Sequence, residues 1–229
     1  MQRRRLHIEG YRDRRPPPLP RSAASHAGFR RWITSRRFPP EVRPTFVDGE
    51  IWLSMSPESL ETHNKVKTEF TAGLARHVRE HDLGEVYSDR SLLSNVDARV
   101  STEPDFLFIA WATSEVGRVR LGRRKHRTEE FIEIIGTPDL VLEIVSDSSV
   151  RKDLVRLKAA YERAGIPEYW VVDARGEQIS FEILTLEGEH YISSALRDQP
   201  QPSGILGARF ELRRARNRLG RYAYTLAID

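Results

Sequence analysis

The sequence predicts an α/β fold with a central mixed β-sheet, flanking helices and a β-hairpin near the start of the folded region. Short runs of apolar and β-branched residues are typical of strands buried on both faces of a sheet. The clearest such runs span residues 106–110, 139–146 and 168–173. Two stretches with helical spacing of apolar residues alternate with these runs, and an Asp48-Gly49 turn joins two further apolar runs. Together these observations predict helices packed against a sheet.

The composition limits the classes of protein that the chain can belong to. Its 229 residues suffice for one medium-sized domain, or for a domain with an extension. It contains no cysteine, which excludes disulfide bonds, thiolate zinc sites and a cysteine nucleophile. No apolar stretch approaches the roughly 20 residues that span a bilayer, and no apolar segment typical of a signal peptide follows the basic N-terminus. We therefore expect a cytoplasmic protein with no membrane partner.

Residues 1–43 are rich in arginine and proline and lack sustained apolar periodicity. Residues 1–44 carry twelve arginines and three acids, a net charge of +9. Because the whole chain has a net charge of +4, the remaining residues carry −5. This composition predicts a basic, poorly ordered N-terminal extension over residues 1–43, followed by a folded domain over residues 44–229. Electrostatic binding of nucleic acid is an alternative role for the extension. Its last part could dock on the domain through Phe29, Trp32, Ile33 and Phe38.

The first half of the domain reads as a hairpin, a helix and three strands. Apolar runs on both sides of Asp48-Gly49 predict the hairpin. A helix is expected from Ser56 to about Asp82, with His63 at the N-terminal end of its apolar face. Strands follow at residues 85–87, around 92–93 and at 106–110, and a long excursion then spans residues 111–137.

A second helix is expected directly after the strand that contains Glu143. Ser146 to Ser149 offer N-caps, and Gly165, followed closely by Pro167, ends the helix. Further strands are expected at residues 168–173, 179–184, 189–194 and 208–212, whereas residues 213–229 are ambiguous.

Glu143 lies in the middle of an apolar strand, where a carboxylate is costly unless it is paired, hydrogen-bonded or bound to a cation. Asp105 begins a second such strand, directly after Glu103-Pro104. Two acids on neighbouring core strands form a site for a hard divalent cation. The sequence therefore predicts a metal site with Asp105 and Glu143 as ligands; a buried structural pair is the alternative.

The second helix offers two lysines that could reach these carboxylates. An apolar stripe is formed by Val150, Leu154, Leu157 and Tyr161. At about 100° per residue, Lys158 lies roughly 60° from the centre of the stripe, whereas Lys152 points almost directly away from it. We therefore expect Lys158 to reach the carboxylates, with a lysine that snorkels at the core boundary as the alternative. Asp153 lies on the opposite border of the stripe, where it could cap, pair with or orient a neighbour.

These residues also carry a family resemblance. The motifs, in order, are Asp48-Gly49-Glu50, His63, Glu103-Pro104-Asp105, Leu142–Ser146, Asp153, Lys158, Tyr161 and Gly165–Trp170. Over roughly residues 44–185, this ordered combination resembles the large bacterial family of putative restriction endonucleases in the PD-(D/E)XK nuclease superfamily. The resemblance implies a restriction-endonuclease-like core and hydrolysis of phosphodiester bonds in DNA that depends on Mg²⁺ or Mn²⁺.

The resemblance further implies roles for particular residues. Asp105 and Glu143 match the two acids of the family and would ligate the metal together with the carbonyl group of Ile144. The metal would activate a water molecule and neutralise charge on the phosphate. A lysine, here Lys158, would steady the attacking water or the phosphate. Candidate accessory residues are His63, Asp153 and Tyr161.

Three features depart from the family pattern. Val145 stands where the superfamily lysine normally follows the second acid, and Thr45 replaces a glutamate that often precedes the Asp-Gly turn. The excursion at residues 111–137 makes the gap between Asp105 and Glu143 long. A nuclease-fold protein that binds nucleic acid or a protein partner without catalysis is therefore the first alternative. A different two-carboxylate hydrolase, such as a glycosidase, is the second.

The excursion is strongly basic. Arginine and lysine supply most contacts with phosphate groups, so the excursion could be a hairpin that reaches over DNA. A solvated hairpin tip, balanced by neighbouring acids, is the alternative. The candidate DNA contacts are Arg120, Arg123, Arg124, Lys125 and Arg127. A homodimer is a further expectation, by analogy, because cutting two strands favours two sites.

Overall fold

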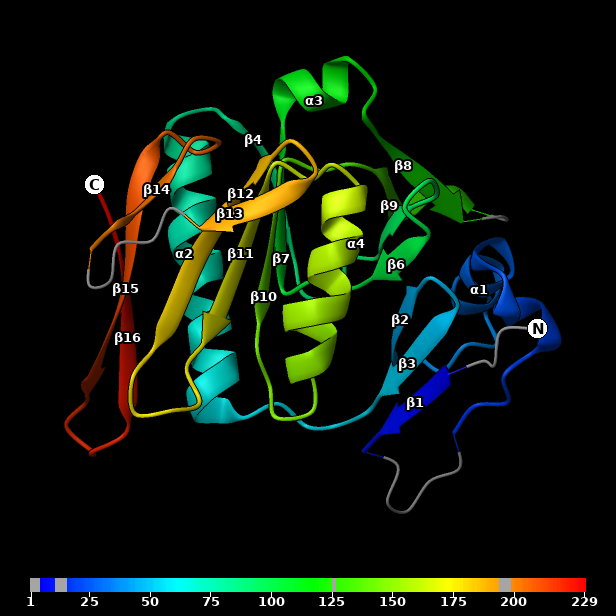
Figure 1. Ribbon diagram of the computed structural model, residues 1–229, viewed down its shortest axis with the longest axis horizontal. Helices are drawn as coiled ribbons and strands as arrows, with labels where there is room; N and C mark the ends of the chain where they lie inside the picture. The colour runs from blue at the N-terminus through cyan, green and yellow to red at the C-terminus, as the bar shows by residue number, and fades with distance from the viewer. Residues whose placement is uncertain (1–4, 11–15, 125–126, 194–198) are drawn as a thin grey trace.

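The computed structural model describes residues 5–10, 16–124, 127–193 and 199–229. A six-stranded mixed sheet forms the centre of the molecule (Figure 1), with the strand order β13-β12-β11-β10-β7-β4. Its strands are β4 (Gly84–Ser88), β7 (Phe106–Ala110), β10 (Leu140–Ile144), β11 (Glu168–Asp173), β12 (Ser180–Glu187) and β13 (His190–Ser193). Only β10 and β11 pair in parallel; the other neighbours are antiparallel. The predicted α/β fold with a mixed sheet is therefore confirmed.

Helices cover both faces of this central sheet. On one face lies α2 (Lys65–Glu80), which a three-stranded sheet covers from outside; its strands are β14 (Gln201–Ser203), β15 (Ala208–Arg216) and β16 (Tyr222–Ile228). Phe70 of α2, Trp170 of β11 and Phe210 of β15 are fully buried in one apolar cluster there. The segment at residues 213–229, which was ambiguous from the sequence, thus completes the outer layer.

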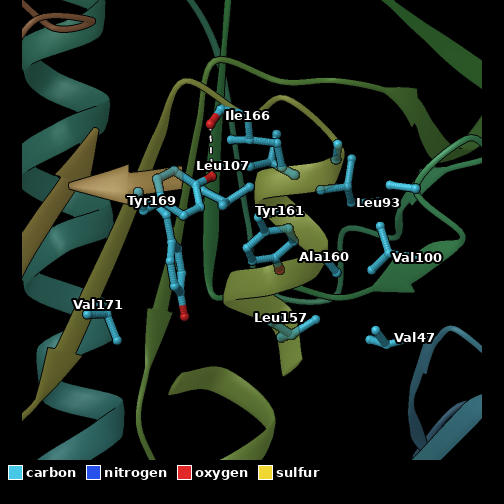
Figure 2. Packing of buried hydrophobic residues seen from close by; sticks show 14 of the residues in the cluster. Val47, Leu93, Val100, Leu107, Leu157, Ala160, Tyr161, Ile166, Tyr169 and Val171 are labelled. Atoms are coloured by element: carbon cyan, nitrogen blue, oxygen red, sulfur yellow. Dashed lines mark hydrogen bonds between the residues drawn. The ribbon is translucent and has the colours of Figure 1, made fainter. Parts of the chain in front are cut away.

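The other face of the central sheet packs against α4 (Lys158–Arg163). Figure 2 shows Tyr161 of this helix beside Tyr169 of β11 and Leu107, and the two tyrosine rings meet edge to face with centroids 5.2 Å apart. The hydroxyl group of Tyr191 donates a hydrogen bond of 2.8 Å to the carbonyl oxygen of Ile166, which fixes the loop that leads from the helix into β11.

A seven-stranded sheet packs beside this core, with the order β1-β3-β2-β6-β5-β9-β8. Its strands are β1 (Arg5–Glu9), β2 (Arg43–Val47), β3 (Glu50–Ser54), β5 (Leu93–Asn95), β6 (Val100–Thr102), β8 (Val119–Arg124) and β9 (Arg127–Gly136). The predicted hairpin is β2–β3, and its turn places Asp48 and Gly49 at φ 49° and 88°, the left-handed values that a two-residue hairpin turn requires. The basic excursion forms the short helix α3 (Trp111–Glu115) and the β8–β9 hairpin.

The described part of residues 1–43 is folded, unlike the poorly ordered extension expected from its composition. Strand β1 pairs in parallel with β3, and α1 (His26–Ile33) packs on the β2–β3 hairpin, with the rings of Phe29 and Phe46 5.2 Å apart. Both rings are fully buried. A short amphipathic helix and one strand suffice to cover the hairpin, and the surrounding arginines and prolines mask this signal in the composition. In the described residues, no helix is long and apolar enough to cross a membrane.

Candidate active site

The structure brings Asp105 and Glu143 together. Strands β7 and β10 are antiparallel with Leu142 opposite Phe106, so one further step along the register places Glu143 opposite Asp105. Because side chains alternate along a strand, both carboxylates point to the face that α4 covers. Asp105 is 8% exposed and Glu143 4% exposed. The backbone N–H of Ile144 donates a hydrogen bond of 2.8 Å to Oδ2 of Asp105, which fixes this carboxylate against β10.

A second carboxylate and two cations complete the surroundings of Asp105. Lys67 Nζ lies 3.0 Å from Asp105 Oδ1 and 2.7 Å from Glu58 Oε1. His63 lies between the same two carboxylates, with Nε2 3.5 Å from Asp105 Oδ2 and Nδ1 3.4 Å from Glu58 Oε2. The Nδ1 contact is an ion-pair distance without hydrogen-bond geometry. One ligand atom from each of Glu58, His63 and Asp105 lies within 4.8 Å of the others, a spacing that can hold a metal ion.

Of these residues, His63 was predicted from the sequence as a site residue, whereas Glu58 and Lys67 were not. Lys67 follows His63 by four residues and is buried on the same helix face as Phe70. A lysine at an inward position of an apolar helix face is a signal that could have identified it. Glu58 offers no comparable signal, because it precedes the π-helical turn Leu60–Asn64 (η2) and reaches the site through the tertiary fold.

The electrostatics of this cluster favour four charged groups. Burial would lower the pKa of His63, but Asp105 and Glu58 together raise it to about 9. Burial would raise the pKa values of Asp105 and Glu58, but His63 and Lys67 lower both. Near neutral pH the two carboxylates are therefore ionised and the two bases protonated, so the charges of these four groups balance.

Glu143 has a different environment. Burial, reinforced by the charges of Asp153 and Asp105 and opposed by Lys152, raises its pKa to about 8. The hydroxyl group of Tyr161 donates a hydrogen bond of 2.7 Å to Glu143 Oε1. Lys152 makes an ion pair with Asp153, which is 1% exposed. A hollow of about 80 Å³ has Asp105, Glu143, Ile144, Lys152 and Asp153 in its lining.

The lysine beside the carboxylates is Lys152, not Lys158 as expected. Lys158 lines a separate hollow of about 220 Å³, together with Asp173 and Glu182. The cause is local: residues Lys152–Leu157 form a π-helical turn (η3), so the step of 100° per residue does not apply. Lys152 and Leu157 are five residues apart, which is about one turn of a π-helix, so both side chains face the sheet. Leu154, which was expected in the apolar stripe, is instead 40% exposed.

The donor set fits a hard divalent cation. Mg²⁺ prefers oxygen ligands and is bound through one or two carboxylates with the remaining positions left to water or substrate. Asp105 and Glu143 supply these carboxylates, and Ile144 lines the same hollow. Lys67 and His63 already neutralise Asp105, so a metal ion would have to replace part of these contacts.

Comparison with known proteins agrees with this arrangement. The Uma2 family, described as a putative restriction endonuclease, matches residues 27–214. The chain belongs to the Uma2 family. A solved structure described as a putative nuclease belonging to DUF820, from Anabaena variabilis ATCC 29413, is similar in fold with a TM-score of 0.52 and 16% identity, over 72% of this chain and 83% of that one. No curated protein matches the chain. Family and fold support a nuclease function in general terms.

Two positions where this Uma2 chain departs from the family pattern are now placed. Val145, at the usual lysine position, is fully buried in the apolar cluster with Leu157 and Tyr161. Thr45 lines the hollow and hydrogen-bonds to Thr102 at 3.2 Å, so no carboxylate reaches the site from β2 there. Glu103 also lines the hollow, and burial raises its pKa to about 7.

The arginines predicted as DNA contacts lie on the β8–β9 hairpin, at one edge of the seven-stranded sheet. Arg120 and Arg123 are exposed, and the guanidinium group of Arg123 stacks on Phe131 with 5.1 Å to the ring centroid. Arg124 pairs with Glu130 at 2.7 Å. Lys125 and the side chain of Arg127 lie outside the described residues.

Proposed function

We propose that the protein is a divalent-metal-dependent endonuclease that hydrolyses phosphodiester bonds in DNA. The observation that carries the proposal is the pair of buried carboxylates, Asp105 and Glu143, on adjacent strands beside the ion pair of Lys152 with Asp153. Family membership supports nuclease chemistry, and the donor set supports Mg²⁺ or Mn²⁺.

Each residue has a role in this mechanism. Asp105, Glu143 and the carbonyl group of Ile144 would hold the metal ion, which, when bound, would supply an activated water molecule and a counter-charge for the phosphate. The ammonium group of Lys152 stabilises negative charge on the phosphate, and Asp153 holds that group in place. Tyr161 orients Glu143 through its hydrogen bond. The arginines Arg120 and Arg123 of the β8–β9 hairpin contact the DNA backbone.

The test compares two lysines on the same helical segment. Lys152→Met should lower the rate of plasmid cleavage in Mg²⁺ by at least about 100-fold, because a preorganised charge aimed at the phosphate is lost. Lys158→Met changes the same residue type six positions later, in the separate hollow, and should retain the wild-type rate. Equal rates for both variants would refute the role of Lys152.

Metal binding is tested separately. Calorimetry with Mg²⁺ or Mn²⁺ should show binding to the wild type that is lost in Glu143→Ala. No binding at millimolar metal, even with DNA fragments present, would refute the metal-dependent mechanism.

A second candidate is a nuclease-fold protein that binds nucleic acid without cleaving it. One observation favours it: Lys67 and His63 already balance the charges of Asp105 and Glu58, so the cluster is satisfied without a metal ion. The two candidates differ in a simple outcome. The binding protein retains DNA binding when EDTA is present and shows no metal-dependent cleavage with any DNA substrate.

A further inference from the structure

The hairpin between β15 and β16 carries the densest positive charge in the described C-terminal region. Residues 208–228 contain six arginines and one acidic residue, Glu211. The arginines are Arg209, Arg213, Arg214, Arg216, Arg218 and Arg221. Residues 216–221, which we call the arginine tip, are all exposed. Like charges held this close together repel one another, and a bound polyanion would relieve this repulsion. The arginine tip is therefore suited to bind a polyanionic partner.

The arginine tip is rigid, because its backbone is closed by hydrogen bonds. Asn217 Oδ1 accepts from the N–H groups of Leu219 at 2.9 Å and Arg221 at 3.1 Å, and Arg216 Nη1 donates to the carbonyl oxygen of Gly220 at 2.6 Å. Gly220 adopts φ 73°, a conformation that glycine enters without strain. A fixed backbone presents its arginines with little loss of chain entropy on binding.

Stacking fixes part of the cationic surface as well. The guanidinium groups of Arg214 and Arg216 lie 4.4 Å and 4.6 Å from the ring centroid of Tyr222. Arg218, by contrast, makes no hydrogen bond or ion pair within the part of the chain that the structure describes. Its charge is therefore available to a partner.

The tip is attached to the same turn that holds the site. The N–H group of Tyr222 donates to Glu61 Oε2 at 2.7 Å, and Lys65 Nζ donates to the carbonyl oxygen of Tyr222 at 2.7 Å. Glu61 belongs to η2, the turn that also carries His63 to Asp105. Figure 1 shows the β15–β16 turn at the end of α2 where that helix begins, and the β8–β9 hairpin on the opposite side of the central sheet.

We propose that the arginine tip binds the sugar–phosphate backbone of a DNA strand whose scissile phosphate lies at the carboxylate site. Guanidinium groups bind phosphate groups bidentately, and contacts with phosphates position a nucleic acid without reading its sequence. The inference rests on the proposed nuclease function for its choice of partner. The family model matches residues 27–214, so the arginine tip lies outside the matched segment.

The experiment removes two charges from the tip and two from elsewhere. The double variant Arg218→Gln/Arg221→Gln is compared with Arg76→Gln/Arg79→Gln, which removes two exposed arginines near the C-terminal end of α2, about 20 Å from its start. Fluorescence anisotropy with a short labelled DNA duplex, in metal-free buffer, measures binding without cleavage. Thermal melting shows whether each variant is folded.

The tip variant should bind at least about tenfold more weakly at about 0.1 M salt, and its slope of log K against log salt should fall by about 2, because two phosphate contacts are lost. The control variant should bind within about twofold of the wild type. If both variants lose the same affinity, or neither does, the tip is not a specific contact and the inference is overturned.

Cleavage in Mg²⁺ separates this inference from the proposed function. A wild type that cleaves DNA, with a tip variant that binds like the control variant, refutes the inference and leaves the nuclease function standing. Loss of binding in the tip variant, with no cleavage by the wild type, supports binding of the DNA backbone by the arginine tip but refutes the nuclease function, and with it the placement of a scissile phosphate at the carboxylate site.

Discussion

The substitution Lys67→Met tests the charge balance at the site most directly. Lys67 has a side chain that is 9% exposed, and its Nζ lies 2.7 Å from Glu58, 3.0 Å from Asp105 and 3.1 Å from Asp89. Removing it leaves His63 beside Asp105 and Glu58, together with Arg43, which pairs with Glu58. Removal of one partner from a buried ion pair typically lowers the free energy of unfolding by about 3–5 kcal/mol. Because other cations still face the carboxylates after Lys67→Met, we expect a loss at the lower end of this range, about 3 kcal/mol.

That loss should be visible as a change in melting temperature. For a chain of this size, 1 kcal/mol corresponds to about 2–4 °C, so Lys67→Met should melt roughly 6–12 °C below the wild type in metal-free buffer at pH 7. Lys158→Met is the matched control, because Lys158 lies in the separate hollow, away from these carboxylates. The control should melt close to the wild type.

Metal ions should partly restore the variant. A divalent cation that binds the folded state stabilises it in proportion to its affinity, and Lys67 competes with that cation for Asp105. Millimolar Mg²⁺ should therefore raise the melting temperature of Lys67→Met more than that of the wild type. A variant that melts like the control, or equal effects of Mg²⁺ on both proteins, would refute this account of the site.

Three further predictions concern titration and orientation. His26 is buried, and burial lowers its pKa to about 4, so the unfolded state binds a proton first as pH falls below about 6.5. This group alone should lower the free energy of unfolding by about 2 kcal/mol between pH 7.5 and pH 5, whereas His63 and Glu143, whose pKa values are raised, act in the opposite direction. Chemical denaturation of the wild type and of His26→Gln at both pH values should show this difference of about 2 kcal/mol between the two proteins. Mg²⁺ affinity measured by calorimetry should rise between pH 7 and pH 9, because Glu143, with a pKa of about 8, must lose its proton to bind metal. Tyr161→Phe should shift that rise to higher pH, since the lost hydrogen bond stabilises the ionised form of Glu143; an unchanged profile would exclude the orienting role of Tyr161.

The positions of Asp105 and Glu143 on core strands could be predicted from the sequence because they depend only on local rules. Apolar runs identify core strands, side chains alternate along them, and a carboxylate inside such a run demands a partner. These rules place the two residues on one face only if their strands pair, and the structure pairs β7 with β10 in a register that brings them opposite each other. The β2–β3 hairpin followed in the same way from Asp48-Gly49.

The choice between Lys152 and Lys158 could not be made by these rules. Helical periodicity assumes a constant angle per residue. The π-helical turn at Lys152–Leu157 has a different angle per residue, so Lys152 faces a direction that a regular α-helix would not give it. Glu58 was missed for a related reason, since it precedes η2 and the π-helical turn between it and His63 has no regular spacing that the sequence pattern could reveal. Local patterns therefore identified the site residues that lie on strands, but not the charged residues that helical segments bring to the site.

Both π-helical turns lie at the ends of helices where charged side chains enter the site. η2 carries His63 to Asp105, and η3 carries Lys152 and Asp153 into the hollow with Glu143. Such turns are frequent at functional sites, because the wider turn re-aims side chains that a regular α-helix would point elsewhere. Val145, at the position where the superfamily lysine normally stands, packs in the apolar core and carries no charge. The cation beside the carboxylates is therefore supplied by a helical segment.

The resulting site is neutral without a metal ion. Glu58 and Asp105 are balanced by His63 and Lys67, Asp153 is paired with Lys152, and Glu143 has a pKa of about 8, so it is mostly protonated near neutral pH. A site balanced in this way does not need a metal ion to fold, unlike structural metal sites, whose apo forms are unfolded. Metal binding then requires proton release from Glu143 and rearrangement of the cations around Asp105. A bound phosphate would favour the rearrangement, because its negative charge attracts Lys67 and His63, but it would oppose proton release by raising the pKa of Glu143. The arrangement thus couples metal binding to substrate binding.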